Sequence, residues 1–93
     1  MSLMDWKGFR QNLMGRIGDL GKLSPDSLGG YLMASGAGAK TGHLDEKTRQ
    51  LISIAVAVTT RCDGCISVHS QKAVESGATR EENAEALGVA IAM

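Results

Sequence analysis

Residues 51–69 read LISIAVAVTTRCDGCISVH, and the fold depends on how the apolar run that begins this stretch is interpreted. β-Branched residues alternate at positions 52, 54, 56 and 58, which fits a buried strand as well as a buried helix. A strand that leads into a C-x-x-C at a helix start would be the thioredoxin arrangement. That arrangement needs further strands and a proline loop after the cysteines, whereas the only proline is Pro25. We therefore predict a buried helix over residues 45–60 and an all-α protein.

The segments that follow this stretch also predict helices. A helix over Cys62–Ser76 is expected to end at Gly77, because glycine adopts the left-handed conformation that commonly terminates helices. Thr79–Glu82 has the spacing of a capping box, which predicts the start of a last helix. The apolar side of this helix is expected to carry Ala84, Leu87, Gly88 and Ile91.

The first forty residues predict two further helices. An amphipathic helix is expected from Asp5 to Leu20, because apolar residues recur there at spacings of three and four: Trp6, Phe9, Leu13, Ile17 and Leu20. Ser24 and Pro25 predict the capped start of a short helix that continues through Met33. The glycines of Gly36–Gly42 are expected to break that helix and form a connector, since no strand precedes them as a dinucleotide-binding loop would require.

The composition excludes several classes of partner. The 93 residues contain 10 Lys and Arg against 10 Asp and Glu, so no net charge attracts nucleic acid or a membrane surface. The chain lacks a secretory apolar segment and has only two cysteines, which predicts a reducing compartment, by default the cytoplasm. A chain of this size with one Trp, one Phe and one Tyr buries a marginal core, so we expect a homo-oligomer.

Both cysteines lie in one motif, Cys62-Asp63-Gly64-Cys65, and His69 follows one helical turn later. The first turn of a helix favours a thiolate, and thiolates attack peroxides and disulfides. His69 falls at i+4 from Cys65 and has an ordinary pKa suited to proton transfer near neutral pH. Two alternatives stay open. In the first, the cysteine pair is half of a zinc site, although the only other histidine is His43. In the second, the thiols are inert and buried.

Taken together, the residues from Leu44 to Met93 resemble the carboxymuconolactone decarboxylase family, specifically its alkylhydroperoxidase D-like branch. The resemblance is carried by the C-x-x-C with its histidine and by three flanking segments: residues 44–51 (LDEKTRQL), 77–82 (GATREE) and 85–90 (EALGVA). The resemblance implies an all-α helical bundle that assembles as a trimer or hexamer. It implies an antioxidant thiol peroxidase or disulfide oxidoreductase that needs neither cofactor nor metal.

By this resemblance Cys65 is the residue that attacks the hydroperoxide, Cys62 resolves the resulting sulfenic acid to a disulfide, and His69 belongs to a proton relay. A dithiol reductant such as a lipoylated protein would then regenerate the thiols. The motif of the branch has a glutamate twelve residues before the first cysteine, where this chain has Gln50. If the chain reverses near Thr60, the two helices run antiparallel and Gln50 faces His69. Glutamine orients an imidazole but cannot take its proton, so Gln50→Glu is predicted to raise peroxide turnover.

Two other functional classes remain as alternatives. A decarboxylase or lactone-processing member of the same family would use a pocket rather than the thiols. A non-catalytic, oligomeric redox-sensing module would oxidise its thiols once and change its assembly.

We interpret residues 1–93 as a single domain of this family. Within it, residues 1–3 are interpreted as an expression scar, residues 5–43 as N-terminal helices and a Gly-rich connector, and residues 44–93 as the core motif region. The last helix reaches Met93 without a terminating residue, so we expect the natural chain to continue.

Overall fold

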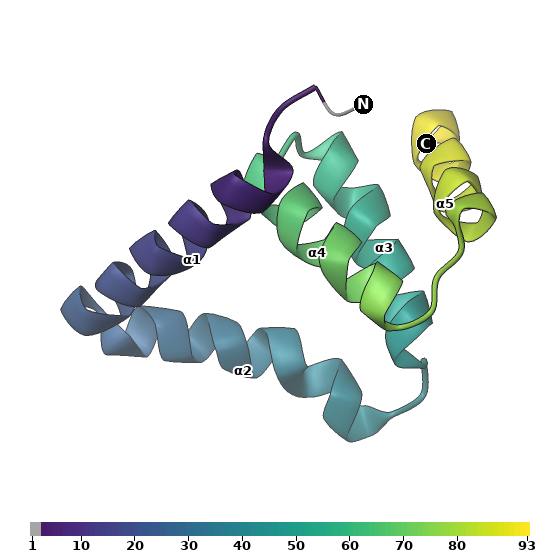
Figure 1. Ribbon diagram of the computed structural model, residues 1–93. Coiled ribbons are helices and arrows are strands. Elements are labelled where there is room, and N and C mark those ends of the chain that lie inside the picture. The colour runs from purple at the N-terminus through teal and green to yellow at the C-terminus, as the bar shows by residue number, and fades with distance from the viewer. Residues whose placement is uncertain (1–2) are drawn as a thin grey trace. The chain divides into compact units, whose positions relative to one another are not determined.

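The computed structural model describes residues 3–93, and all the regular elements in that range are α-helices. The prediction of an all-α protein is therefore confirmed. The helices are α1 (Trp6–Leu23), α2 (Pro25–Thr41), α3 (Glu46–Thr59), α4 (Asp63–Glu75) and α5 (Arg80–Ala92), shown in Figure 1. The chain forms two compact units, which divide between His43 and Leu44.

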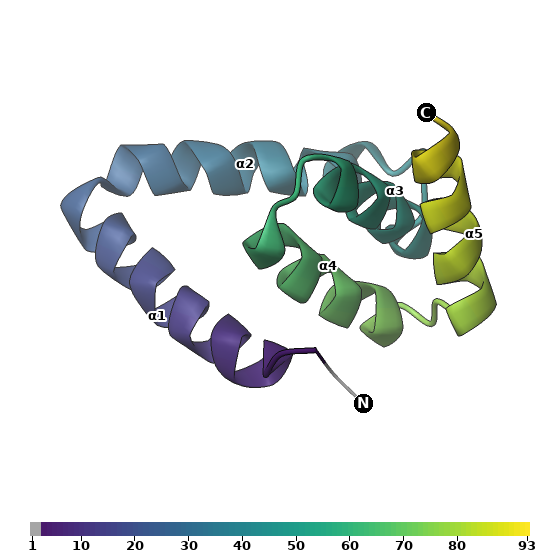
Figure 2. The same ribbon diagram turned by 90° about the horizontal axis from the view of Figure 1, so that it is seen from above.

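The first unit is a helical hairpin whose two helices meet at Ser24 and diverge from it, as Figure 2 shows. The Ser24 N–H donates to the Leu20 carbonyl at 2.7 Å and ends α1, and Pro25 begins α2. The Ser24 hydroxyl donates to the Ser27 hydroxyl at 2.7 Å instead of accepting from the backbone. Gly21 lets the two helices approach, because a Cβ there would lie 2.6 Å from Leu28 Cδ2.

The prediction that Gly36–Gly42 forms a connector is wrong. Helix α2 continues through Gly36 and Gly38 to Thr41 and ends at Gly42, whose φ is 71°. Each interior glycine costs a helix up to about 1 kcal/mol relative to alanine, but Ala34, Ala37 and Ala39 lie beside Gly36 and Gly38 and favour the helix. Only the last glycine occupies the left-handed position that terminates a helix. Helix α1 likewise runs to Leu23, past the predicted Leu20.

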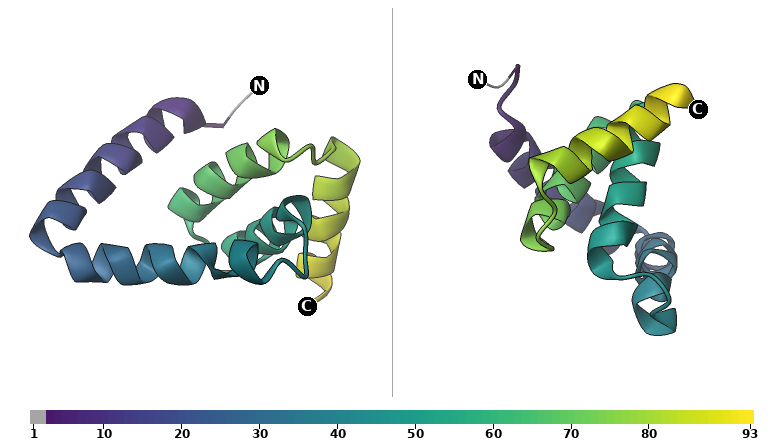
Figure 3. Two further views of the ribbon diagram at one scale, coloured as in Figure 1. Left: turned by 90° about the horizontal axis from the view of Figure 1, so that it is seen from below. Right: turned by 90° about the vertical axis from the view of Figure 1, so that its right-hand side faces the viewer.

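The second unit places α3 between α4 and α5, and Figure 3 shows α3 and α4 as an antiparallel pair with α5 on the other side of α3. The predicted helices over 45–60 and 62–76 are confirmed within one or two residues, with Asp45 and Cys62 as their N-caps. Apart from one isoleucine, the side chains buried in this unit are small or polar: Gln50, Ile54, Ala57, Ser67, Ala73 and Ala90. Small residues let helix axes approach closely, which holds the facing side chains of α3 and α4 at a fixed register.

The last two helix boundaries follow the sequence signals. After α4, the Ala78 N–H donates to the Ala73 carbonyl at 2.9 Å and the Gly77 N–H to the Val74 carbonyl at 3.0 Å, with Gly77 at φ 87°. These two bonds make a Schellman motif. The predicted capping box of α5 is also confirmed, because Thr79 and Glu82 exchange side-chain and backbone hydrogen bonds.

The apolar side of α5 is partly different from the prediction. Ala90 is buried and Ala86 and Leu87 are half-buried, whereas Ala84, Gly88 and Ile91 are exposed. Within its unit α5 packs mainly on α3, so only one narrow line of its residues is covered. Among the described residues, no helix combines the length and the apolar character needed to cross a membrane.

Candidate active site

The site is positioned by the tight turn between α3 and α4. The Cys62 N–H donates to the Ala57 carbonyl at 3.0 Å and the Arg61 N–H to the Val58 carbonyl at 3.4 Å, which is again the Schellman pattern. Arg61 occupies the left-handed position of this motif, with φ 56°, where glycine is usual. Cys62 is therefore both the residue that closes α3 and the N-cap of α4.

Cys62 and Cys65 are joined by a disulfide, with their Cα atoms 5.2 Å apart. The Cys65 backbone N–H donates to the Cys62 sulfur at 3.2 Å, so this sulfur replaces the usual oxygen of an N-cap. Both residues are half-buried. In the dithiol form, the unpaired N–H groups and the dipole of the first turn of α4 favour negative charge on a sulfur at this position.

His69 lies in the middle of α4 and Gln50 in the first half of α3, and their side chains are in contact. His69 Nδ1 is 2.7 Å from Gln50 Oε1, although nineteen residues separate them in the sequence. The antiparallel hairpin that was expected to bring Gln50 opposite His69 is therefore confirmed. Gln50 is 7% exposed, so its amide has little access to water. His69 is four residues after Cys65 on the same helix, hence on the same face.

The surroundings of His69 favour its neutral form. Burial lowers the pKa of His69 below its ordinary value of 6.5, and the positive charge of Lys72 lowers it further. The carboxylate of Glu46 acts in the opposite direction and raises the pKa, but it does not outweigh burial. The imidazole is therefore a base that stays unprotonated at neutral pH.

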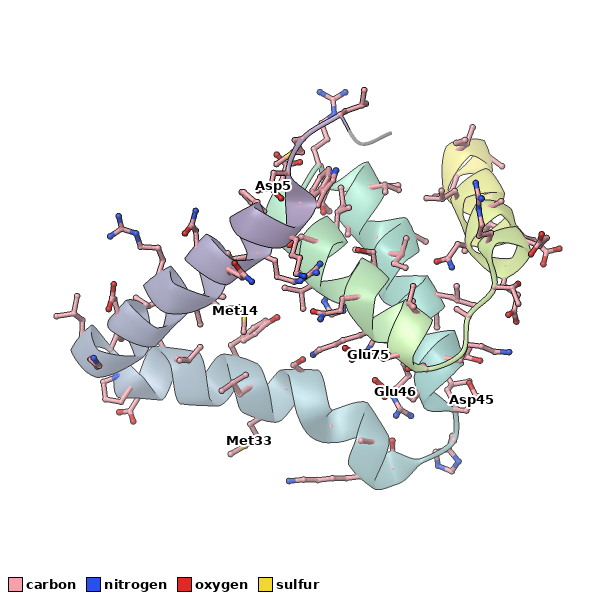
Figure 4. All side chains as sticks on the ribbon, in the orientation of Figure 1. Asp5, Met14, Met33, Asp45, Glu46 and Glu75 are labelled. Carbon is pink, nitrogen blue, oxygen red and sulfur yellow. A yellow bond between two sulfur atoms is a disulfide. The ribbon has the colours of Figure 1, made fainter. Side chains whose placement is uncertain are left out.

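Glu46 is the residue of this site that the sequence did not reveal. It stands at the start of α3, where Figure 4 labels it beside Asp45, and the sequence pattern indicated only an acid in the first turn of a helix. In the structure its Oε1 accepts from Gln50 Nε2 at 2.9 Å and its Oε2 accepts from Arg49 Nη2 at 2.6 Å. These bonds lower the pKa of the Glu46 carboxyl, the Arg49 bond most. The i, i+4 spacing of Glu46 and Gln50 was the available signal.

The described residues 3–93 contain no group of three or more His, Cys, Asp or Glu side chains that could hold a metal ion. His43, the other histidine, follows α2 and belongs to the first compact unit. Among these residues, therefore, Cys62 and Cys65 do not belong to a cluster with the further ligands that a zinc site needs.

The structure has the arrangement that the resemblance led us to expect. A cysteine pair lies at the start of α4, a histidine follows one turn later, and α3 faces them. The sequence model of the carboxymuconolactone decarboxylase family matches residues 25–93 of the chain. The chain belongs to the carboxymuconolactone decarboxylase family. The crystal structure of an apo carboxymuconolactone decarboxylase family protein from Legionella pneumophila has the same fold, with a TM-score of 0.88 and 38% identity over 95% of this chain and 79% of that one.

Curated relatives of this family member share extended segments with it. An uncharacterized protein of Haemophilus influenzae is 47% identical over 69 residues, which are 74% of this chain and 61% of the relative. An uncharacterized protein of Cupriavidus necator is 33% identical over 84% of this chain and 69% of its own length. A third relative, uncharacterized protein 4 in the cox locus of Paracoccus denitrificans, is 48% identical over 56% of this chain and 47% of its own length. The chain thus spans about half to two thirds of the curated relatives that it matches.

Proposed function

We propose that this family member is a thiol-dependent antioxidant oxidoreductase that cycles Cys62 and Cys65 between dithiol and disulfide. The observation that carries the proposal is the position of the disulfide at the N-terminus of α4, one helical turn before His69. An inert structural bridge would not need a base beside it. A helix N-terminus and an adjacent neutral imidazole are what a reactive thiol needs.

In the oxidising half of the cycle, Cys65 and Cys62 have different roles. The Cys65 thiol gives its proton to His69, and the thiolate attacks the terminal oxygen of a hydroperoxide, ROOH. The O–O bond breaks, ROH leaves with one proton, and Cys65 becomes a sulfenic acid. The Cys62 thiol then attacks the Cys65 sulfur and expels water, which leaves the disulfide seen in the structure.

In the reducing half, a dithiol partner returns the pair to its starting state. One thiolate of the partner attacks Cys62, the sulfur at the N-cap, and Cys65 leaves as the thiolate. The second thiol of the partner then displaces Cys62, so the partner becomes a disulfide and two protons return to the protein. A dihydrolipoyl group, as on a lipoylated protein, has the two adjacent thiols that this step requires.

Because position 50 carries an amide, we expect disulfide exchange to be faster than peroxide reduction. An amide in contact with His69 Nδ1 orients the ring but cannot accept its proton, so the imidazolium formed when Cys65 ionises has no carboxylate in direct contact. Exchange needs only a modest thiolate fraction, since the best attacking thiol has a pKa near the ambient pH. We therefore expect dithiol–disulfide exchange to depend less on this contact.

The decisive measurement is steady-state consumption of an organic hydroperoxide with dihydrolipoamide as the reductant. We expect turnover by the unaltered chain, none by Cys65→Ser, and in Cys62→Ser a single sulfenic acid at Cys65 followed by a stall. Peptide-level mass spectrometry identifies which sulfur is oxidised. His43→Ala is the matched control, because it removes the other imidazole of the chain without touching α3 or α4.

Two results would count against this function. Equal turnover in the unaltered chain and in a variant that lacks both cysteines would show that the thiols are not used, which reopens the lactone-processing alternative. Oxidation that occurs once, cannot be reversed by dihydrolipoamide and changes the assembly would favour the redox-sensing alternative.

A further inference from the structure

Three polar side chains form a continuous hydrogen-bonded chain from the first turn of α3 to the middle of α4. Gln50 Nε2 donates to Glu46 Oε1 at 2.9 Å, and Gln50 Oε1 is 2.7 Å from His69 Nδ1. The motif that identified the site assigns a role to the histidine and to the position of Gln50, whereas Glu46 belongs to the flanking segment 44–51, to which no chemical role was assigned.

The chemistry of Glu46 fixes which group donates and which accepts in each of these hydrogen bonds. An ionised carboxylate only accepts hydrogen bonds, so the amide nitrogen of Gln50 must face Glu46. The amide oxygen then faces His69, and since an amide oxygen only accepts, the hydrogen between the two residues must be on His69 Nδ1. Because Gln50 is 7% exposed, water offers little competition for either amide group.

The orientation of the Gln50 amide decides which ring nitrogen of neutral His69 is basic. With the hydrogen on Nδ1, the lone pair is on Nε2, the nitrogen that does not contact Gln50. If the amide were reversed, its nitrogen would donate to Nδ1, the hydrogen would move to Nε2, and the ring would have no lone pair to offer Cys65.

We propose that Glu46 is a positioning residue that holds neutral His69 in the Nδ1–H tautomer through Gln50 and so leaves Nε2 free to take the proton of Cys65. When Cys65 ionises, its S–H bond breaks, the proton moves to Nε2, and Nδ1–H continues to donate to Gln50. The electron pair stays on the sulfur and no oxidant or reductant takes part. The use of Nε2 as a base rests on the proposed function, whereas the tautomer itself does not.

Glu46 is held by partners other than Gln50. Its second oxygen accepts from Arg49, which also donates to the Leu44 carbonyl, so both oxygens of the carboxylate are engaged. About half of the Glu46 side chain is exposed, at 49%. Lys72 of α4 is the other charged group that acts on His69, and it opposes the effect of Glu46 on the His69 pKa.

The test uses Glu46→Gln, which keeps the size and the hydrogen-bonding reach of the side chain. A glutamine at position 46 can present either its oxygen or its nitrogen to Gln50. The three side chains therefore stay in contact, but the Gln50 amide is no longer held in one orientation. Glu81→Gln is the matched control, because Glu81 is also an exposed acid in the first turn of a helix, α5. Both variants lose the same favourable interaction with a helix N-terminus.

The primary readout is the tautomer of His69 in the ¹⁵N-labelled chain, from two-bond ¹H–¹⁵N correlation spectra recorded above the pKa of His69. We expect the Nδ1–H form in the unaltered chain and in Glu81→Gln, and a substantial Nε2–H population in Glu46→Gln. An Nε2–H tautomer in the unaltered chain would overturn the inference without any variant. An unchanged Nδ1–H tautomer in a folded Glu46→Gln would overturn it as well.

The second readout is the rate at which iodoacetamide alkylates Cys65 in the reduced chain, followed by mass spectrometry across pH 5–9. We expect Glu46→Gln to slow alkylation at neutral pH by on the order of tenfold, as for other partners that fix a histidine tautomer, and Glu81→Gln to match the unaltered chain. Equal rates in all three would overturn the role of Glu46. Because neither readout uses a peroxide or a dithiol, a chain with no turnover would contradict the proposed function alone.

Discussion

His69 Nδ1 lies 2.7 Å from Gln50 Oε1, and this contact joins the two helices that carry the site. The contact pairs an imidazole with a group that has no acid–base chemistry of its own at neutral pH. If the proposed function holds, the reactivity of the cysteine pair is expected to depend on the basicity of His69 and on the carboxylate of Glu46, which contacts Gln50.

His69→Ala is expected to slow alkylation of reduced Cys65 at pH 7 by about 10²-fold, the lower range for the loss of a general base. The variant leaves the cysteines at the start of α4 and removes only the proton acceptor one turn later. Iodoacetamide kinetics with peptide-level mass spectrometry measure the effect at each sulfur. The control is His43→Ala, for which we expect an unchanged rate, and a rate unchanged in both variants would mean that His69 takes no part.

The stability of the chain is expected to fall as the pH is lowered from about 6.5 towards 5. Because burial and Lys72 lower the pKa of folded His69, the unfolded chain binds a proton near its ordinary pKa of 6.5 and the folded chain only at lower pH. The unfolded state then holds more protons across this window, which reduces the free energy of unfolding. Well above pH 6.5 His69 is unprotonated in both states and the effect is absent.

Urea denaturation between pH 5 and 7.5 isolates this histidine from the acidic groups. The pKa values of Asp45, Glu46 and Glu82 are lowered by hydrogen bonds, to Thr48, Arg49 and Lys47 respectively, so their contributions are lost only below their ordinary values of 3.8 to 4.5. His69→Asn should flatten the profile and His43→Asn should preserve it. A slope that survives in His69→Asn would assign the pH dependence to another group.

The turn that places Cys62 is expected to tolerate glycine better than valine at position 61. Arg61 has φ 56°, a conformation that costs side-chain-bearing residues roughly 1 kcal/mol or more and β-branched residues the most. Arg61→Gly should therefore exceed Arg61→Val in free energy of unfolding by more than about 1 kcal/mol in urea titrations of the reduced chain. The equivalent position after α4 gives the reciprocal control, since Gly77→Ala should destabilise by about 1 kcal/mol. Equal stabilities for the two Arg61 variants would contradict the left-handed conformation.

The helices of the second unit could be predicted because local chemistry and tertiary packing favour the same boundaries. Asp45, Gly77 and the capping box of Thr79 each mark a helix end by a side chain or a glycine at a fixed offset, and the structure ends the helices there. The contact between Gln50 and His69 could be predicted for a related reason, because the register of a short helical hairpin follows from the position of its turn.

The remaining features depend on information that a local pattern lacks. Glycines at 36 and 38 resemble a connector in any short window, and only the balance with the neighbouring alanines keeps α2 continuous to Thr41. The contact between Glu46 and Gln50 was not predicted because an acid in a first turn already has a sufficient explanation in the helix dipole. The hydrogen bond that Glu46 accepts from Gln50 Nε2 can be assigned only when the orientation of the Gln50 amide is known.

The chain is expected to form a homo-oligomer at micromolar concentration. Neither α1 nor α2 has a buried residue, and large apolar side chains are exposed on both units, including Leu23 and Ile91 at 86% and Met33 at 72%. Figure 4 shows Met33 pointing away from α1, so the hairpin of its own unit does not cover it. Exposed apolar surface on this scale is typical of an interface. Sedimentation velocity should show a trimer or a larger species, and a monomer would contradict the expectation.

Exchanging the two polar residues of α3 is expected to raise peroxide turnover more than Gln50→Glu alone. The single variant puts a second carboxylate about where the Gln50 amide now lies 2.9 Å from Glu46. Because position 50 is buried, the new carboxylate then competes with Glu46 for one proton. Part of the population would then present a protonated acid to His69. In the double variant Glu46→Gln/Gln50→Glu, the amide at position 46 donates to the carboxylate at position 50, which stays ionised and accepts from His69 Nδ1.

Hydroperoxide consumption with dihydrolipoamide should therefore increase in the order unaltered chain, Gln50→Glu, double variant, with a gain of up to about 10²-fold for the last. Adding His69→Ala to the double variant should cancel the gain, because the carboxylate acts only through the imidazole. Gln11→Glu provides a control for the added charge, since Gln11 is an exposed residue of α1. If the double variant turned over no faster than Gln50→Glu, competition between the two carboxylates would not limit the reaction, and this prediction would be wrong.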